Sequence, residues 1–130
     1  METKKKPQES EKTLEARLVR EIEARGGMAL KYTSQYHRGI PDRICLMPCA
    51  MLTFVELKST GKKPTKLQEH AMQKLRGLNF DCVVIDSTET LEKYLEDVDR
   101  AIRNDAIVRP IYEKCLEQIN AAVYEAENAK

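Results

Sequence analysis

The segment from Leu52 to Lys58 constrains the fold of this chain most strongly, because its last four residues alternate between apolar and charged side chains. Successive side chains of a β-strand point to opposite faces of the sheet. Val55 and Leu57 are therefore expected to face a core, whereas Glu56 and Lys58 share the other face. The pattern predicts a sheet that carries a carboxylate and an ammonium group side by side.

The rest of the sequence predicts a small mixed sheet flanked by helices, an α/β fold. Apolar positions at helical spacing predict a helix from Ser10 to the Gly26-Gly27 pair, and Thr65 and Gln68 have capping-box spacing at the head of another. Strands are expected at 28–33, 43–47, 52–58 and 80–85, with a hairpin between the second and third. Two further helices are expected, one capped by Ser87 or Thr88 and a separate one beginning at Pro110.

Composition excludes several classes of protein. The 130 residues fit a single domain, and a net charge of +1 argues against a histone-like polycation. Apolar runs fall far short of the roughly 20 residues that span a membrane. The polar start does not resemble a signal peptide, so a cytoplasmic protein with reduced cysteines is expected.

The expected hairpin can bring a second carboxylate to the charged face of the third strand. Asp42 precedes the second strand, and a hairpin of this length can place it beside Glu56. Two carboxylates that close repel unless a cation lies between them, and oxygen ligands suit Mg²⁺ or Mn²⁺. Glu15, beside the apolar stripe of the first helix, is the candidate third acid. Such a site would suit phosphodiester hydrolysis, with Lys58 orienting the attacking water or offsetting charge.

Basic side chains cluster next to this candidate site. Lys58, Lys62, Lys63 and Lys66 fall within nine residues that contain no acid, which is typical of contacts to a phosphate backbone. We expect further basic residues to extend this surface: Lys31, His37, Arg38 and Arg43. The alternative interpretation of the lysine run is a solubilising loop.

The order of these motifs resembles the VRR-Nuc branch of the PD-(D/E)XK nucleases. The resemblance covers residues 11–98 and is carried by Gly39-Ile-Pro-Asp42, Phe54-Val-Glu-Leu-Lys58, Gly61-Lys-Lys-Pro64, Gln68 and Val83-Val-Ile-Asp-Ser87. It implies a restriction-endonuclease-like αβββαβ core, with a helical extension at the C-terminus.

The resemblance also assigns roles to residues. Asp42, Glu56 and Lys58 match the catalytic triad of the family, and Gln68 matches a catalytic glutamine. By the same match Glu15, Asp42, Glu56 and the Leu57 carbonyl would bind the metal, Mg²⁺ or Mn²⁺. Basic residues expected to contact DNA are Lys31, Arg38, Lys62, Lys63 and Lys66. Gln68 has a second interpretation, in which it only completes the capping box.

The family further implies a metal-dependent DNA endonuclease of the stand-alone bacterial or phage type. Branched DNA, including four-way (Holliday) junctions, is the expected substrate, a homodimer the expected assembly, and no small-molecule cofactor or membrane is expected. Expected regions are a flexible basic tail at 1–9, a nuclease domain at 10–98, and a helical extension at 99–130 that packs on the core or pairs with a second subunit. Two alternatives stay open: a catalytically silent DNA-binding module, and a nuclease for flaps, single strands or RNA.

Overall fold

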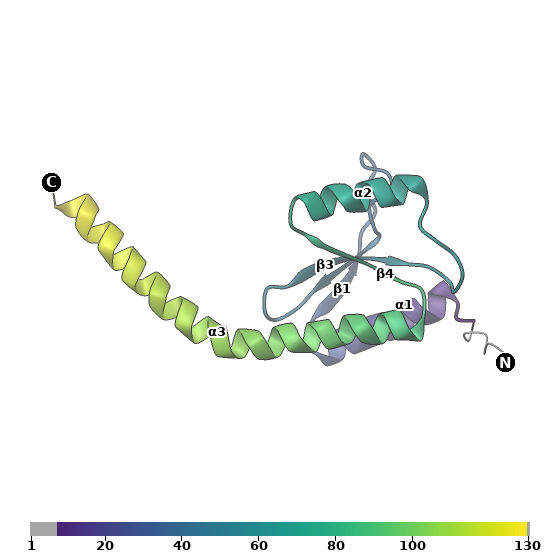
Figure 1. The fold of residues 1–130 in the computed structure, drawn as a ribbon, viewed down its shortest axis with the longest axis horizontal. Coiled ribbons are helices and arrows are strands. Elements are labelled where there is room, and N and C mark those ends of the chain that lie inside the picture. The colour runs from purple at the N-terminus through teal and green to yellow at the C-terminus, as the bar shows by residue number, and fades with distance from the viewer. Residues whose placement is uncertain (1–7, 130) are drawn as a thin grey trace, which may run out of the picture.

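The computed structural model describes residues 8–129, which form a four-stranded sheet between helices (Figure 1). The elements follow the order α1 (Glu11–Ala24), β1 (Met28–Lys31), β2 (Arg43–Leu46), β3 (Leu52–Leu57), α2 (Lys66–Gly77), β4 (Asp81–Ile85) and α3 (Thr88–Asn128). The predicted mixed α/β fold with an αβββαβ core is confirmed.

The sheet has the strand order β1-β2-β3-β4. The first two pairings are antiparallel and the third, between β3 and β4, is parallel, with α2 as the crossover between those two strands. Figure 1 shows α2 on one face of the sheet, and α1 with the first half of α3 on the other. The strands therefore lie in the middle layer of three.

The main core lies between the sheet and the α1–α3 layer. Three leucine and isoleucine side chains of α1, at spacings of four, are fully buried there, and Val55 and Leu57 point into the same core from β3. Since strand side chains alternate, Glu56 is directed to the other face, where α2 lies. The alternation predicted from the sequence thus sets which side of the sheet carries the charged group.

One prediction about the helices is wrong. The separate helix expected from Pro110 does not exist, because α3 runs unbroken from Thr88 to Asn128 with Pro110 inside it. A proline within a helix removes one backbone hydrogen bond and usually bends the axis instead of ending the helix. Figure 1 shows α3 changing direction about halfway along, where it leaves the core. Residues 106–129 of α3, which we call the arm, are all exposed.

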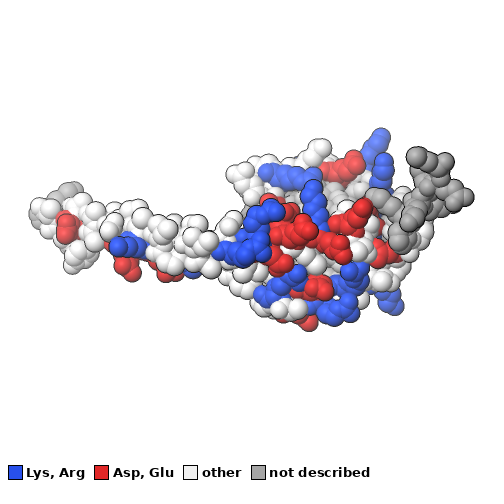
Figure 2. All heavy atoms as spheres, turned by 60° about the horizontal axis from the view of Figure 1, so that its bottom comes forward, with Lys and Arg blue, Asp and Glu red and all other residues white. Residues whose placement is uncertain are grey.

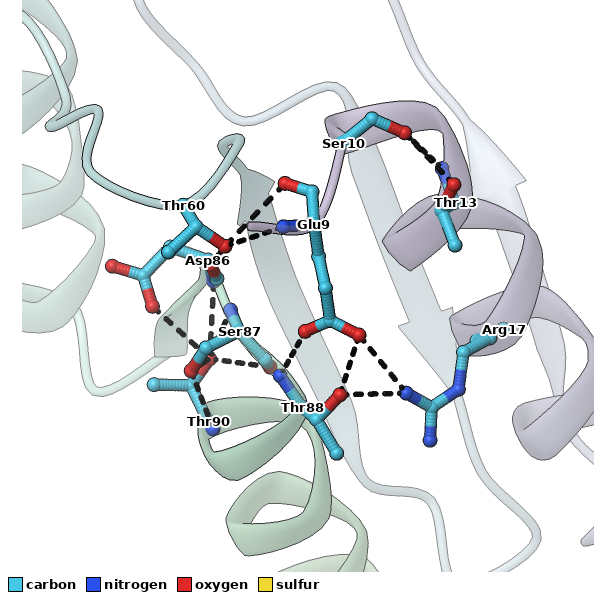
Figure 3. Close-up of polar contacts among 9 residues, drawn as sticks. All are labelled: Glu9, Ser10, Thr13, Arg17, Thr60, Asp86, Ser87, Thr88 and Thr90. Carbon is cyan, nitrogen blue, oxygen red and sulfur yellow. Dashed lines mark hydrogen bonds and ion pairs between the residues drawn. The ribbon is translucent and has the colours of Figure 1, made fainter. Parts of the chain in front are cut away.

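The predicted tail at residues 1–9 needs a correction at its last residue, while residues 1–7 lie outside the described part of the chain. Glu9 is anchored to the start of α3, where its carboxylate accepts a hydrogen bond from the Thr88 backbone N–H at 2.6 Å. Figure 3 shows this carboxylate between Thr88 and the guanidinium of Arg17, whose Nη1 lies 3.5 Å from Glu9 Oε1. A carboxylate at a helix N-terminus satisfies an unpaired N–H and complements the helix dipole.

Glu9 also binds the loop that follows β3. Two hydrogen bonds of 3.0 Å join Glu9 to Thr60: the Glu9 backbone N–H donates to the Thr60 hydroxyl Oγ1, and the Thr60 backbone N–H donates to the Glu9 carbonyl. Thr60 Oγ1 also donates to the Asp86 carbonyl at 2.9 Å. Glu9 thereby joins the start of α1 to the loop two residues beyond Lys58 and to the start of α3.

No helix within residues 8–129 is long and apolar enough to cross a membrane. The four cysteines are all unpaired, as expected for reduced thiols.

We predict that Glu9→Ala lowers the free energy of unfolding by about 1–2 kcal/mol, because it leaves the start of α3 without its carboxylate cap. Chemical denaturation monitored by circular dichroism measures the change. Glu23→Ala, at an exposed position on α1, is the matched control and should change stability by less than about 0.5 kcal/mol. Equal effects of the two substitutions would contradict a capping role for Glu9.

Candidate active site

Glu56 is a buried charged residue whose carboxylate is oriented by two neighbours. It lies on β3 and is 6% exposed. Gln68 Nε2 donates to Glu56 Oε1 at 2.9 Å, and Lys58 Nζ lies 3.4 Å from the same oxygen. Within residues 8–129, Glu56 Oε2 accepts no hydrogen bond. One carboxylate oxygen is therefore held in place, while the other stays available for a ligand.

Gln68 completes the capping box of α2 and also contacts Glu56. Its side-chain oxygen accepts from the Thr65 backbone N–H at 2.9 Å, and its own backbone N–H donates to Thr65 Oγ1 at 3.2 Å, which completes the capping box of α2. Because the amide carries an oxygen and a nitrogen, the nitrogen remains free to bind Glu56. The capping bond fixes the amide, which in turn orients the carboxylate.

Asp42 lies across the hairpin from Glu56. Arg43 pairs with Val55 in the antiparallel register, so one step further Asp42 stands opposite Glu56 and on the same face. Its carboxylate forms no hydrogen bond or ion pair with any other described residue. The predicted juxtaposition of the two acids is therefore present at the open end of the β2–β3 hairpin.

A glycine fixes the approach of the loop that carries Asp42. Gly39 has a φ of +85°, which favours glycine, and a Cβ there would lie 2.7 Å from the Leu67 carbonyl oxygen. Leu67 directly precedes Gln68, so this contact seats the loop against the first turn of α2. The glycine of the Gly-Ile-Pro-Asp motif is thus explained by this close contact with α2, which the sequence alone did not indicate.

The surroundings of Glu56 disfavour its charged form. Burial, the largest cause, raises the pKa of this carboxyl above its ordinary value, and the ammonium group of Lys58 offsets part of that shift. The negative charges of Asp42 and Glu11 raise the pKa further. A cation placed between these acids would remove the repulsion.

Glu15, the predicted third acid, has a different partner in the structure. Its carboxylate forms an ion pair with Arg43 Nη2, and Arg43 Nη1 donates to the Ala29 carbonyl at 3.1 Å. Arg43 shares the face of Val55, on the α1 side of the sheet, whereas Asp42 and Glu56 lie on the other. Sequence reasoning missed Glu11, the acid one helical turn earlier, whose charge acts on Glu56. Its place in the first turn of α1 was the available signal.

The residues present fit a divalent cation that keeps part of its water shell. Within residues 8–129, no three His, Cys, Asp or Glu side chains are grouped as a complete metal-binding cluster. Mg²⁺ does not require one, since it commonly binds proteins through one or two carboxylates and retains several waters. Two carboxylates that repel each other, with one oxygen of Glu56 unpaired, are a suitable donor set.

Most of the predicted DNA-contacting residues are exposed. This holds for Lys31 at the end of β1, Arg38 in the β1–β2 loop, Lys62 and Lys63 in the loop between β3 and α2, and Lys66 at the start of α2. Arg43 is the exception, because its side chain is 14% exposed and paired with Glu15. We therefore remove Arg43 from the predicted DNA-binding surface.

Comparison with known proteins gives the family. No family model matches the chain. Over 81 residues, it is 41% identical to "Putative nuclease p44" of Acyrthosiphon pisum secondary endosymbiont phage 1, an alignment that covers 61% of this chain and 85% of that protein. A solved structure described as "VRR_NUC domain" superposes with a TM-score of 0.64 at 23% identity, covering 68% of this chain and 97% of the other. The chain belongs to the same family as this putative phage nuclease, and it has the fold of the VRR_NUC domain.

The phage relative and the shared VRR_NUC fold together support the resemblance inferred from the sequence. The shared fold supports the predicted αβββαβ core. The catalytic and metal-binding roles of individual residues stay predictions, which variants of this chain can test. These residues are Asp42, Glu56, Leu57, Lys58 and Gln68.

We predict that Glu56→Gln stabilises the metal-free protein at pH 7. A raised pKa means that the folded protein binds this proton more tightly than the unfolded chain does, so the charged carboxylate costs stability as the pH rises above its ordinary value of 4.5. The stability difference between wild type and Glu56→Gln should therefore shrink below that pH. Denaturant titrations across pH 4–8 measure it.

The control is Glu125→Gln, at an exposed position on the arm. It should follow wild type at every pH. Adding Mg²⁺ should raise the melting temperature of wild type and of this control but not of Glu56→Gln. A Glu56→Gln variant that is less stable than wild type at pH 7 would contradict the claim that the charged Glu56 carboxylate destabilises the metal-free fold.

Proposed function

We propose that this VRR-Nuc protein is a metal-dependent DNA endonuclease that hydrolyses phosphodiester bonds, acting on branched DNA in the cytoplasm of a bacterium or a phage-infected host. The observation that carries the proposal is the buried, oriented carboxylate of Glu56 opposite the unpaired carboxylate of Asp42. Two carboxylates that close repel each other and destabilise the folded chain unless they bind a cation. The name of the phage relative as a nuclease supports the same activity.

Asp42, Glu56 and the Leu57 carbonyl are the proposed metal ligands, and Mg²⁺ or Mn²⁺ the proposed ion. When bound, the ion supplies positive charge that polarises a phosphoryl oxygen and acidifies water. Glu15 as a further ligand stays a prediction, because it would first have to leave Arg43.

The remaining side chains have proposed roles in the hydrolysis, in which water attacks phosphorus and a P–O bond breaks. Lys58 places its ammonium group beside Glu56, where it can offset the negative charge that grows on the phosphate in the transition state. Gln68 holds Glu56 Oε1 in a fixed direction, which preorganises the site. Lys31, Arg38, Lys62, Lys63 and Lys66 are proposed to contact the DNA backbone.

We predict that Asp42→Ala or Glu56→Ala lowers the rate of cleavage at least ~10³-fold while the fold stays intact, since either substitution removes a ligand of the charge-stabilising ion. The assay uses a labelled four-way junction and a matching linear duplex, each in Mg²⁺, in Mn²⁺ and in EDTA. Glu125→Ala on the arm is the control and should cut like wild type.

Each outcome of that assay is informative. Metal-dependent cuts in the junction alone support a branched-DNA nuclease, whereas equal cutting of both substrates removes the preference for branched DNA. Binding without cutting in either metal would favour the catalytically silent module. Activity like wild type in a folded Asp42→Ala or Glu56→Ala variant would refute the proposed site.

A homodimer is proposed because the arm carries an apolar stripe that lacks a partner among the described residues. Its members recur at spacings of three and four and leave charged residues at the edges: Val108, Tyr112, Cys115, Leu116, Ile119, Ala122, Val123 and Ala126. In Figure 2, charged side chains of both signs cover the core, while most of the visible surface of the arm is uncharged. With 24 residues, the arm is about 36 Å long, enough for several turns of helix pairing with a second copy.

Pairing of two copies also suits the proposed activity. A symmetric dimer presents two identical sites, as cleavage of two strands of a junction requires. The alternative that residues 99–130 pack on the core holds only for the first part, because everything beyond Asp105 within the described chain is exposed.

We predict that Ile119→Glu converts the dimer to a monomer, because it places a charge in the centre of the apolar stripe. Light scattering coupled to size-exclusion chromatography measures the mass. Ile107→Glu, at an exposed isoleucine of the same helix outside the apolar stripe, is the matched control and should leave a dimer. A monomeric wild type, or a dimer that survives Ile119→Glu, would contradict pairing through the arm.

A further inference from the structure

A cleft of about 530 Å³ lies between the β1–β2 loop and α2, apart from the carboxylate pair. Figure 1 shows this loop extending past α2. The floor is apolar and comes from α2 and its end, with Leu67, Ala71, Leu75 and Leu78. The volume falls in the range of sites for small organic groups.

The polar lining of the cleft is entirely basic, neutral or aromatic. Arg38 and His37 come from the loop, and Lys74 and His70 come from α2, while no acid lines the cleft. Tyr36 at the rim is 90% exposed, and Leu78 is 68% exposed. An apolar floor, an exposed aromatic ring and two permanent positive charges together complement a flat base attached to a phosphate.

The cleft is connected to the candidate active site through the backbone. Ile40, which lines the cleft, is two residues before Asp42, and Leu67, which also lines it, is directly before Gln68. The close approach of Gly39 to the Leu67 carbonyl holds these two segments together. A nucleotide in the cleft would therefore lie near a phosphate at the carboxylate pair.

We propose that this cleft binds one unpaired nucleotide of the DNA, with the base against Tyr36 and the leucines of α2, and its phosphate against Arg38 and Lys74. The inference rests on the proposed DNA nuclease function and deepens it. It gives the chain a way to prefer branched DNA without reading sequence, because stacking on an aromatic ring accepts any base. Paired bases in a continuous duplex cannot enter the cleft.

The test is a binding measurement in EDTA, so that cleavage does not contribute. Fluorescence anisotropy compares a duplex that contains one unpaired nucleotide with the same duplex carrying an abasic residue at that position. The two have equal phosphate charge and differ only in the base. We expect wild type to bind the first about tenfold more tightly, within the range that stacking of one base contributes.

Tyr36→Ala and Leu78→Ser, both at exposed positions, should each bring this ratio close to one while leaving the affinity for the abasic duplex unchanged. Tyr124→Ala, which removes an exposed tyrosine on the arm, is the matched control and should keep the tenfold ratio. A ratio near one in wild type would overturn the proposal, and so would a tenfold ratio that survives both cleft substitutions.

The outcome is separable from that of the proposed nuclease function. If the tenfold ratio and its loss in Tyr36→Ala are found but no DNA is cut in Mg²⁺ or Mn²⁺, the cleft proposal stands and the nuclease proposal fails. If metal-dependent cutting is found with a ratio of one, the nuclease proposal stands and the cleft proposal is overturned.

Discussion

The burial of the Glu56 carboxylate against the sheet is the constraint on which the rest of the site depends. Glu56 is 6% exposed, so its carboxylate needs polar partners, and Oε1 has two: a hydrogen bond from Gln68 and an ion pair with Lys58. The Gln68 hydrogen bond ties the first turn of α2 to β3, and the close approach of Gly39 to the Leu67 carbonyl seats the Asp42 loop against the same turn. The two like charges of Asp42 and Glu56 are thereby held close together. Their proximity lowers the stability of the fold but provides a binding site for a cation.

The parts of this arrangement that the sequence predicted are those set by local geometry. Alternation along β3 separates Val55 from Glu56, the hairpin register sets Asp42 opposite Glu56, and the spacing of Thr65 and Gln68 specifies a capping box. Each follows from a few consecutive residues. The fold class followed in turn, because the order of such elements leaves few ways to cover both faces of a small sheet.

The parts that the sequence did not predict depend on contacts between distant segments. Glu9 was assigned to a flexible tail, yet its partners Thr60 and Thr88 lie 51 and 79 residues away. Glu15 was expected at the metal, but Arg43 from the neighbouring strand engages it, and nothing in the spacing of either residue indicates that pairing. Pro110 was interpreted as a helix start, although a proline preceded by a full helical turn can equally bend a continuous helix.

The most direct test of the central claim is a crystal of the protein soaked in Mn²⁺, with diffraction data collected at the manganese absorption edge. We predict an anomalous peak in contact with the carboxylates of Asp42 and Glu56 and with the Leu57 carbonyl. A peak that lies elsewhere in the molecule, or an occupied site that persists in Glu56→Gln, would contradict the claim that the strained carboxylate pair is the metal site.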